Sequence, residues 1–368
     1  MQQRTEPFQF RLTVNRISAV MILAFLFWCP PGGGFAQELV IAPTFDEVGH
    51  FHEGIAPALF AGKWGFIDKS GKWVLKPRFD EVQTGSGGRF GVRAGNVWGF
   101  LNTAGKVAVE PVYEAVKPFS SGLATVRENG MWGYIDPAGT MVVEPTYTFA
   151  GEVFNGFRFV KDDESGFRIL TGSGVPVDIY LESDSEHFEA GAFADNGWAP
   201  VKSGGAWYFS SVRGDVMSTP FKSARGFSEG LAAVSVDGKL WGFTNVEGRM
   251  VVPARYEGAR DFVGGVAPVK IGGKWGFIDK KAKVVLSPRY DNAYPVRDGW
   301  AIFRVGDRRG FLKVSSPVDI VEAVKARFED VYSPKEGLAP VKLHGKWGFI
   351  RLSETGSLVR DVVDLDGQ

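Results

Sequence analysis

The sequence has few of the residues on which common catalytic and metal sites depend. It contains one cysteine, Cys29, and four histidines among 368 residues. Cys29 falls in an N-terminal segment that we expect to be removed, as argued below. The remaining chain would then have no disulfide, thiolate nucleophile or cysteine metal ligand. The formal net charge is zero and no basic patch stands out, which argues against a nucleic-acid partner.

Long helical periodicity is also missing, since no long stretch repeats apolar residues at helical spacing. The chain is instead rich in glycine and aromatic residues, with 48 Gly, 30 Phe, 11 Trp and 9 Tyr beside 20 Pro. This composition is typical of many short strands and tight turns. Hydrophobic residues make up 44% of the chain, enough for a buried core. We therefore expect an all-β fold.

Residues 1–36 differ from the rest of the chain. A basic lead precedes a largely apolar run at 17–29, and Gly34 and Ala36 place small residues before a cleavage point ahead of Gln37. This is the layout of a secretory signal peptide. An uncleaved anchor is the alternative, but the run is short against the roughly 20 residues of a membrane span. We predict an exported protein, periplasmic or extracellular, without a membrane span after cleavage.

A motif built on Trp-Gly recurs along the chain with a spacing of about 34 residues. Its pairs are Trp64-Gly65, Trp98-Gly99, Trp132-Gly133, Trp241-Gly242, Trp275-Gly276 and Trp347-Gly348. Weaker copies at Ser165-Gly166-Phe167, Trp207-Tyr208-Phe209 and Arg309-Gly310-Phe311 fill the gaps. Nine copies of one strand are thus predicted. We assign these tryptophans to the structural framework, and the glycine after each to a close backbone approach or a positive φ.

The flanks of this strand repeat as well. Upstream lies a Gly-Leu/Ile-Ala run, and downstream an Asp/Asn-x-x-Gly turn such as Asp68–Gly71. This turn precedes a Val-rich strand that ends in Pro and an aromatic residue, such as Pro77 and Phe79. The same pair, Pro43 and Phe45, comes before the first Trp-Gly strand. The pattern predicts a three-stranded meander with a type I turn closed by a left-handed glycine.

These residues resemble the WG-repeat family, whose core Lys-Trp-Gly-Phe/Tyr-Ile-Asp is matched at 63–68, 131–136 and 274–279. The resemblance implies an all-β repeat array, found mostly in bacteria, often exported, and without catalytic residues. Repeats need neighbours to share a core. We expect an open, curved superhelical array, with a closed β-propeller-like ring as the alternative. The predicted divisions are the signal peptide 1–36, an N-terminal array 37–164, degenerate repeats or an insertion 165–206, and a C-terminal array 207–368.

No other motif indicates a catalytic, metal-binding or phosphate-binding site. Gly226–Gly230 matches a nucleophile elbow, but it occupies a repeat position and no strand-to-helix switch follows. His50 and His52 lack a third metal ligand, the acidic residues 162–164 lack the spacing of a calcium loop, and Gly85–Gly88 lacks the lysine of a phosphate loop. We predict no catalytic residue, no metal site and no cofactor.

The leading functional hypothesis is a non-catalytic scaffold that binds another protein or an envelope polymer, because repeat arrays present extended surfaces. A carbohydrate-binding protein is the second hypothesis. Its ligand-facing aromatics would be Trp73, Trp198 and Trp300, the last two of which also fit core positions. A hydrolase of envelope polysaccharide or peptidoglycan is the third, without a motif to support it.

Overall fold

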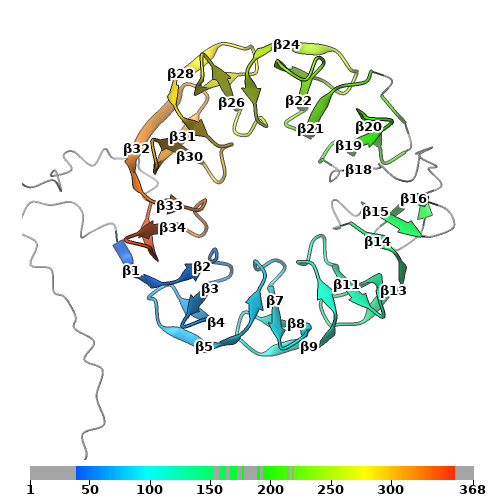
Figure 1. The fold of residues 1–368 in the computed structure, drawn as a ribbon, viewed down its shortest axis with the longest axis vertical. Helices are drawn as coiled ribbons and strands as arrows, with labels where there is room; N and C mark the ends of the chain where they lie inside the picture. Colours follow the sequence, from blue (N-terminus) through cyan, green and yellow to red (C-terminus); the bar gives the residue numbers. More distant parts are fainter. Residues whose placement is uncertain are drawn as a thin grey trace, which may run out of the picture.

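The computed structural model describes residues 39–151, 157–162, 166–171, 176–177, 189–190, 194–213, 215–217 and 219–352. This part of the chain contains no helix, and therefore none that could cross a membrane. It forms nine small antiparallel sheets that follow one another around a ring (Figure 1). We number the sheets one to nine by the order of their Trp-Gly strands. The predicted signal peptide lies outside the described residues, as do residues 172–175, 178–188 and 191–193 of the irregular stretch between 165 and 206.

The three predicted strands of each repeat are present in most sheets. The strand before the Trp-Gly strand is β3 (Ile55–Phe60), β7 (Arg89–Ala94), β11 (Ala124–Glu128), β15 (Phe157–Asp162), β19 (Trp198–Ser203), β22 (Leu231–Ser235), β26 (Val266–Ile271), β30 (Trp300–Val305) or β34 (Leu338–Leu343). The Trp-Gly strand or its weaker copy is β4 (Lys63–Asp68), β8 (Val97–Asn102), β12 (Met131–Ile135), β16 (Gly166–Thr171), β20 (Ala206–Ser211), β23 (Trp241–Thr244), β27 (Lys274–Asp279), β31 (Arg308–Ser316) or β35 (Lys346–Arg351).

The third strand lies at the outer edge of the ring (Figure 1). It is β5 (Trp73–Phe79), β9 (Val107–Tyr113), β13 (Met141–Tyr147), β17 (Pro176–Val177), β24 (Met250–Tyr256), β28 (Val284–Tyr290) or β32 (Asp319–Phe328). A fourth, inner strand was not predicted, because most examples have only two residues. It is β2 (Glu47–Val48), β6 (Glu81–Val82), β10 (Ala115–Val116), β14 (Phe149–Ala150), β18 (Glu189–Ala190), β21 (Ser223–Ser228), β25 (Gly258–Ala259), β29 (Asn292–Ala293) or β33 (Asp330–Val331).

The predicted turn after the Trp-Gly strand is confirmed in detail. In sheet one the Gly71 amide donates to the Asp68 carbonyl at 2.9 Å, and Gly71 has φ +82°. The Asp68 side chain accepts the Ser70 amide at 2.8 Å, which explains the acidic first position. In sheet seven Ala282 takes the place of this glycine and adopts φ +63°. An alanine in that region is strained, because its Cβ crowds the backbone.

The all-β repeat array is confirmed, but its form is the closed ring rather than the open superhelix. The strand β1 (Leu39–Phe45) pairs antiparallel with β35, so that sheet nine has the order β1-β35-β34-β33. Sheet nine therefore takes its outer strand from the other end of the array. The expectation of an open array was wrong because the strand carrying Pro43 and Phe45 supplies the outer strand of sheet nine. In most other sheets this outer strand follows the Trp-Gly strand directly in the chain.

Hydrophobic cores lie between neighbouring sheets. One core joins Phe66 and Phe79 of sheet one to Phe90 of sheet two, and another joins Phe45 and Phe349 of sheet nine to Ile67 of sheet one. A single repeat has no such partner, so each sheet depends on its neighbours for burial. The second core shows that this packing continues without a break across the place where the two ends of the array meet.

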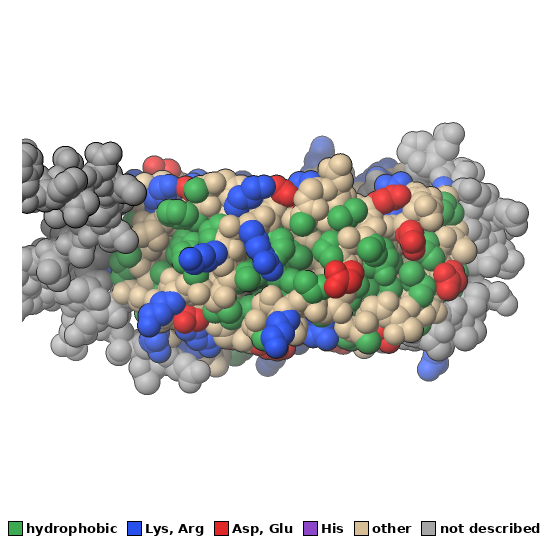
Figure 2. Space-filling view, turned by 90° about the horizontal axis from the view of Figure 1, so that it is seen from below, with side chains coloured by type: hydrophobic (Ala, Val, Ile, Leu, Met, Phe, Trp, Pro, Cys, Tyr) green, Lys and Arg blue, Asp and Glu red, His purple; other side chains and the backbone are tan. Residues whose placement is uncertain are grey.

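The outer strands carry an apolar band around the outside of the ring. Figure 2 shows hydrophobic side chains gathered along the middle of one face, with charged side chains above, below and among them. Val112 is 60% exposed, and Val74 and Val107 are also exposed. Each of these strands also carries a proline, Pro77 in β5 and Pro111 in β9. Proline removes a backbone donor, so the free edge of the sheet is a poor template for pairing with another chain.

Candidate functional site

The framework glycines sit where backbone approaches backbone. A Cβ on Gly65 would lie 2.5 Å from the Leu75 carbonyl oxygen, and one on Gly348 would lie 2.4 Å from that of Ile41. Neither glycine has a positive φ. The sequence allowed two reasons for the glycine after each tryptophan, a close backbone approach or a positive φ. The structure shows that the reason is the close approach. The other four Trp-Gly pairs show the same contact, at 2.4 to 2.6 Å, for Gly99, Gly133, Gly242 and Gly276.

The framework tryptophans are less buried than the aromatic residue two positions later. Phe66 is 1% exposed, whereas Trp64 is half-buried; Trp347, at 4%, is the buried exception. Trp98, Trp132, Trp241 and Trp275 are half-buried like Trp64. Basic side chains cover several of these rings, as Arg260 does for Trp275 at 4.8 Å. The half-buried indole rings thus cover the edges of the cores between neighbouring sheets.

The three tryptophans proposed to face a ligand do not lie together. Trp300 is 7% exposed and packs in the core between sheets eight and nine, so its assignment to a ligand surface was wrong. Trp73 is half-buried and its ring lies edge-on to Phe45, with 5.6 Å between centroids. Trp198 packs at the edge of the core of sheets five and six. Each indole packs against core residues of its own sheets.

Polar residues instead gather in the loops that follow the inner strands. We call these the rim loops; they span residues 49–54, 83–88, 117–122, 260–265, 294–299 and 332–337 after β2, β6, β10, β25, β29 and β33. The fourth residue of each loop pairs with the residue three positions later, as His52 does with Ile55. The two residues between them have positive φ, as in Glu336 (+52°) and Gly337 (+79°). This is type I′ turn geometry, and it explains the Gly-Leu/Ile-Ala run of the sequence.

A rim loop is joined to the turn of the preceding sheet by the same contact at two places in the ring. In sheets six and seven, Glu229 accepts the Gly264 and Gly265 amides at 2.6 and 3.1 Å, and Lys280 pairs with it at 3.1 Å. In sheets nine and one, Glu336 accepts the Gly54 amide at 3.1 Å, and Lys69 pairs with it at 2.7 Å. These contacts hold the pKa of both glutamates below its ordinary value, although burial acts in the opposite direction. The joint between the two ends of the array therefore repeats an internal joint.

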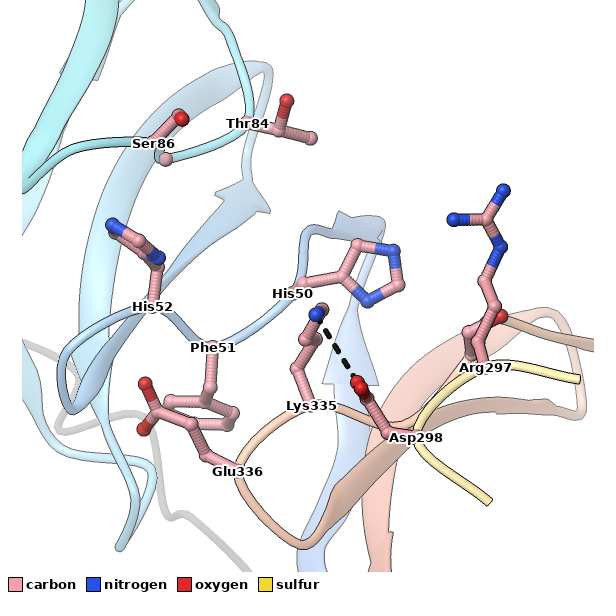
Figure 3. Close-up of a pocket in the computed structure, with 11 residues that line it drawn as sticks. His50, Phe51, His52, Thr84, Ser86, Arg297, Asp298, Lys335 and Glu336 are labelled. Carbon is pink, nitrogen blue, oxygen red and sulfur yellow. Dashed lines mark ion pairs between the residues drawn. The ribbon is translucent and has the colours of Figure 1, made fainter. Parts of the chain in front are cut away.

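Four rim loops of sheets eight, nine, one and two enclose a cavity of about 680 Å³ (Figure 3). Its walls carry several polar side chains beside apolar surface, and they come from both ends of the chain. They are formed by His50, Phe51, His52, Thr84, Gly85, Ser86, Arg297, Asp298, Ser333, Lys335 and Glu336. A cavity of this size suits a small molecule or a side chain of a partner. It is the candidate site.

The two histidines of the cavity are held by neighbouring loops. The His52 Nε2 accepts the Gly88 amide at 3.2 Å. The His50 ring lies 5.7 Å from the ring of Tyr332 in the rim loop of sheet nine. Burial, together with the charge of Lys335, lowers the pKa of His50 from 6.5. His50 is thus uncharged at neutral pH. In the sequence, both histidines had been set aside because no third metal ligand was evident.

The remaining sequence motifs fall elsewhere. Among the described residues no group of three or more His, Cys, Asp or Glu could hold a metal ion, and Asp163 and Glu164 of the acidic run lie outside them. Ser228 of the elbow-like motif belongs to β21, not to a strand-to-helix turn, and its hydroxyl donates to the Phe262 carbonyl at 2.6 Å. This serine joins sheets six and seven. Gly85–Gly88 forms a rim loop.

Arg297, Lys335 and Thr84 were not predicted from the sequence as site residues. They follow inner strands of two residues, which are too short to recognise by periodicity. Arg297 and Lys335 share one signal, their position directly before the two residues of a positive-φ turn. Only the ring closure brings these positions together, and the sequence analysis favoured an open array.

Comparison with solved structures shows likeness in fold alone. A eukaryotic initiation factor matches 78% of this chain and 90% of its own, with a TM-score of 0.55 and 8% identity. The computationally designed protein Ika8 matches 86% of this chain, with a TM-score of 0.45 and 11% identity, and all of its own. BamB from Moraxella catarrhalis matches 77% of this chain and 95% of its own, with a TM-score of 0.38 and 12% identity. Among curated proteins no match was found.

The family model for the WG containing repeat matches the chain eight times. The matched residues are 36–64, 64–98, 98–132, 132–164, 221–239, 241–275, 275–308 and 322–347. These segments coincide with the Trp-Gly strands and their flanks, and they cover more than half of the sequence. The chain therefore belongs to the WG-containing repeat family.

Proposed function

We propose that this protein is an exported, non-catalytic scaffold that binds another protein at the inner rim of the ring. The observation that carries the proposal is the contrast within the rim loops. Their turn geometry is constant, whereas their side chains differ from sheet to sheet, as His52, Ser86 and Lys335 do at one equivalent position. A rigid frame that presents variable loops is the usual arrangement of a binding surface.

The roles of the polar residues support binding over catalysis. The carboxylates of Glu229 and Glu336 hold backbone amides of the next sheet, and the Ser228 hydroxyl holds a backbone carbonyl. These groups fix the loops. A hydrolase would need a nucleophile or a pair of carboxylates free to act on a substrate.

A protein partner is favoured over a carbohydrate. Sugars stack on exposed aromatic faces, yet Trp300 is buried and Trp73 packs against Phe45. The one aromatic ring of Phe or Trp type in the described cavity wall, Phe51, is only 2% exposed. The carbohydrate hypothesis therefore loses Trp300, and its other two residues, Trp73 and Trp198, each pack at the edge of a core.

Affinity capture from the envelope of the producing cell would test the scaffold. Thr84→Arg places a long side chain at the cavity mouth, where Thr84 is exposed, and Thr146→Arg makes the same change on the outer strand β13. We expect one specific partner with the wild type and with T146R, and its loss with T84R. Capture of no partner, or of the same partners by all three proteins, contradicts the proposal.

Export is tested separately, by sequencing the N-terminus of the protein recovered from cell fractions. A mature protein that begins near Gln37 in the periplasm or medium supports it. An intact N-terminus in the cytoplasm contradicts it.

A further inference from the structure

Most charged groups in the cavity wall are already neutralised by a neighbour. Lys335 pairs with Asp298 at 3.1 Å (Figure 3). Glu336 is engaged by Lys69 and by the Gly54 amide. Most charged side chains of the cavity wall are thus already paired within the fold.

Arg297 is different. Its backbone is fixed, because its amide donates to the Trp300 carbonyl at 2.7 Å and its carbonyl accepts the Trp300 amide at 2.9 Å. Its guanidinium has no hydrogen bond or ion pair with any residue that the structure describes, and it is exposed at the cavity wall. A fixed backbone with an uncommitted guanidinium is an arrangement suited to an anionic ligand.

The loops beside Arg297 add to the positive charge. Asp261 is a buried carboxyl whose Oδ1 has no partner among the described residues, and burial raises its pKa despite the opposing charges of Arg225, Arg297 and Arg260. Arg260 itself is held by the Trp275 and Tyr294 rings, at 4.8 and 4.4 Å. Arg225, Arg260 and Arg297 therefore all act electrostatically on this one carboxyl.

The chemistry of the wall favours a singly charged anion. A guanidinium binds both carboxylate and phosphate through two parallel hydrogen bonds. Asp298 and Glu336 also line the cavity, however, and although each is paired with a lysine, their oxygens lie in the wall and disfavour a dianion more than a monoanion. The wall offers no exposed aromatic face for a sugar ring, since Phe51 is buried. These features select a carboxylate carried by a peptide.

We propose that the cavity binds a carboxylate of an acidic peptide, with Arg297 as the anchoring cation. This inference rests on the proposed scaffold function and names the chemistry of the partner at one site. The peptide carboxylate would reach Arg297 between the rim loops of sheets eight, nine and one. Thr84 and Ser86 of sheet two line the opposite side of the cavity (Figure 3).

The test uses defined small probes and the full protein. Acetyl-glutamate amide is titrated against acetyl-glutamine amide, which has the same shape without the charge, and against glucuronate. Binding is followed by NMR shifts of the arginine Nε–H signals. The variants are Arg297→Gln and, as a matched control, Arg249→Gln, which changes an exposed turn arginine outside the cavity. Folding of each variant is checked by circular dichroism and thermal melting.

We expect acetyl-glutamate amide to shift the Arg297 signal and acetyl-glutamine amide not to do so. R297Q should weaken binding about ten-fold or more, because a charge-assisted bidentate contact is lost, while R249Q should bind like the wild type. No shift with acetyl-glutamate amide, equal shifts with both amides, tighter binding of glucuronate, or unchanged affinity of R297Q would overturn the proposal.

The two proposals fail in different ways. If the envelope capture yields a partner that R297Q still binds, and no carboxylate probe binds, the scaffold stands and the carboxylate site is wrong. If the glutamate probe binds through Arg297 but no protein is captured, the carboxylate chemistry stands and the protein-scaffold role is wrong.

Discussion

Sheets one and nine are built to the same plan from differently connected strands. In sheet one the turn 68–72 links the Trp-Gly strand β4 to the outer strand β5, and Trp64 pairs with Phe79, Phe66 with Leu75. In sheet nine no such turn joins β35 to β1, yet Trp347 pairs with Phe45, and Phe349 with Ile41. The register is equivalent although the chain connection is missing. Side chains and the Pro-x-aromatic motif therefore suffice to set the pairing.

The joint contacts around these sheets are also equivalent. Lys63 pairs with Asp80 after β5, and Lys346 pairs with Asp46 after β1. The aspartates each accept an amide of the next hairpin, Gly95 and Ala61 respectively, at 2.9 and 3.2 Å. Comparison of matched substitutions in the two sheets can thus separate what a contact contributes from what the covalent turn contributes.

The largest difference is expected from the paired aromatic residues. Phe45→Ala and Phe79→Ala each remove a buried ring, at a cost of about 3–5 kcal/mol. In F79A the turn still tethers β5, whereas in F45A β1 has no turn and should leave the sheet. We expect F45A to lose more stability in urea and to be cut by protease within residues 39–46. Equal losses, with β1 protected in F45A, would show that the turn is unimportant.

A smaller effect is expected from the framework glycines. Gly65→Ala and Gly348→Ala each place a Cβ about 2.5 Å from a facing carbonyl oxygen, and such overpacking costs about 1–3 kcal/mol. The strand β1 can relieve the clash by moving away, whereas β5 is held by its turn. Hydrogen exchange should therefore show fast amides in β1 of G348A and slower ones in β5 of G65A. Comparable protection of both strands would argue against this freedom of β1.

A pH effect should be specific to the joint between sheets nine and one. His50 contacts the rim loop of sheet nine, and its pKa is lowered in the folded state. The unfolded protein therefore takes up a proton first, so stability is full above about pH 6.5 and falls as the pH drops below it. His50→Gln should reduce this loss in melting experiments between about pH 7 and pH 5. His344→Gln, in an exposed hairpin, is the control and should keep the wild-type dependence; a H50Q protein as acid-sensitive as the wild type would refute the assignment.

The smallest effect is expected from the matched lysines. Lys63 and Lys346 are both about half exposed, and exposed ion pairs contribute little and are screened by salt. Lys63→Ala and Lys346→Ala should lower the melting temperature slightly and by similar amounts, and the loss should shrink at high salt. A large loss with K346A alone would mean that this pair, rather than the β1 ladder, holds the ring closed.

The repeat framework could be predicted from the sequence because it depends on local geometry. The turn at Asp68–Gly71, the close approach at Gly65 and the nine related strands each leave a residue signature at a fixed spacing. The inner strands were missed since two residues show no periodicity. The ring was not favoured, although Pro43 and Phe45 had been recognised as an outer-strand motif, because strand pairing between distant segments leaves no local signal.

The site was less predictable for the same reason. His50 and Arg297 are far apart in the sequence and become neighbours only through the closure of the ring. Trp300 was proposed to face a ligand because of its residue type, although its position in the repeat also fitted the core, and the structure places it in the core. The residue type of Trp300 suggested ligand binding, whereas its burial shows that it packs in the core.

The pairing of β1 with β35 has a kinetic consequence. It brings together segments about 300 residues apart, and contacts of such separation form slowly since a long loop must close first. The other sheets contain strands that are neighbours in the chain and can assemble progressively. Closure is therefore expected as the last folding step, and the cavity, whose wall includes loops from both ends, exists only after that step is complete.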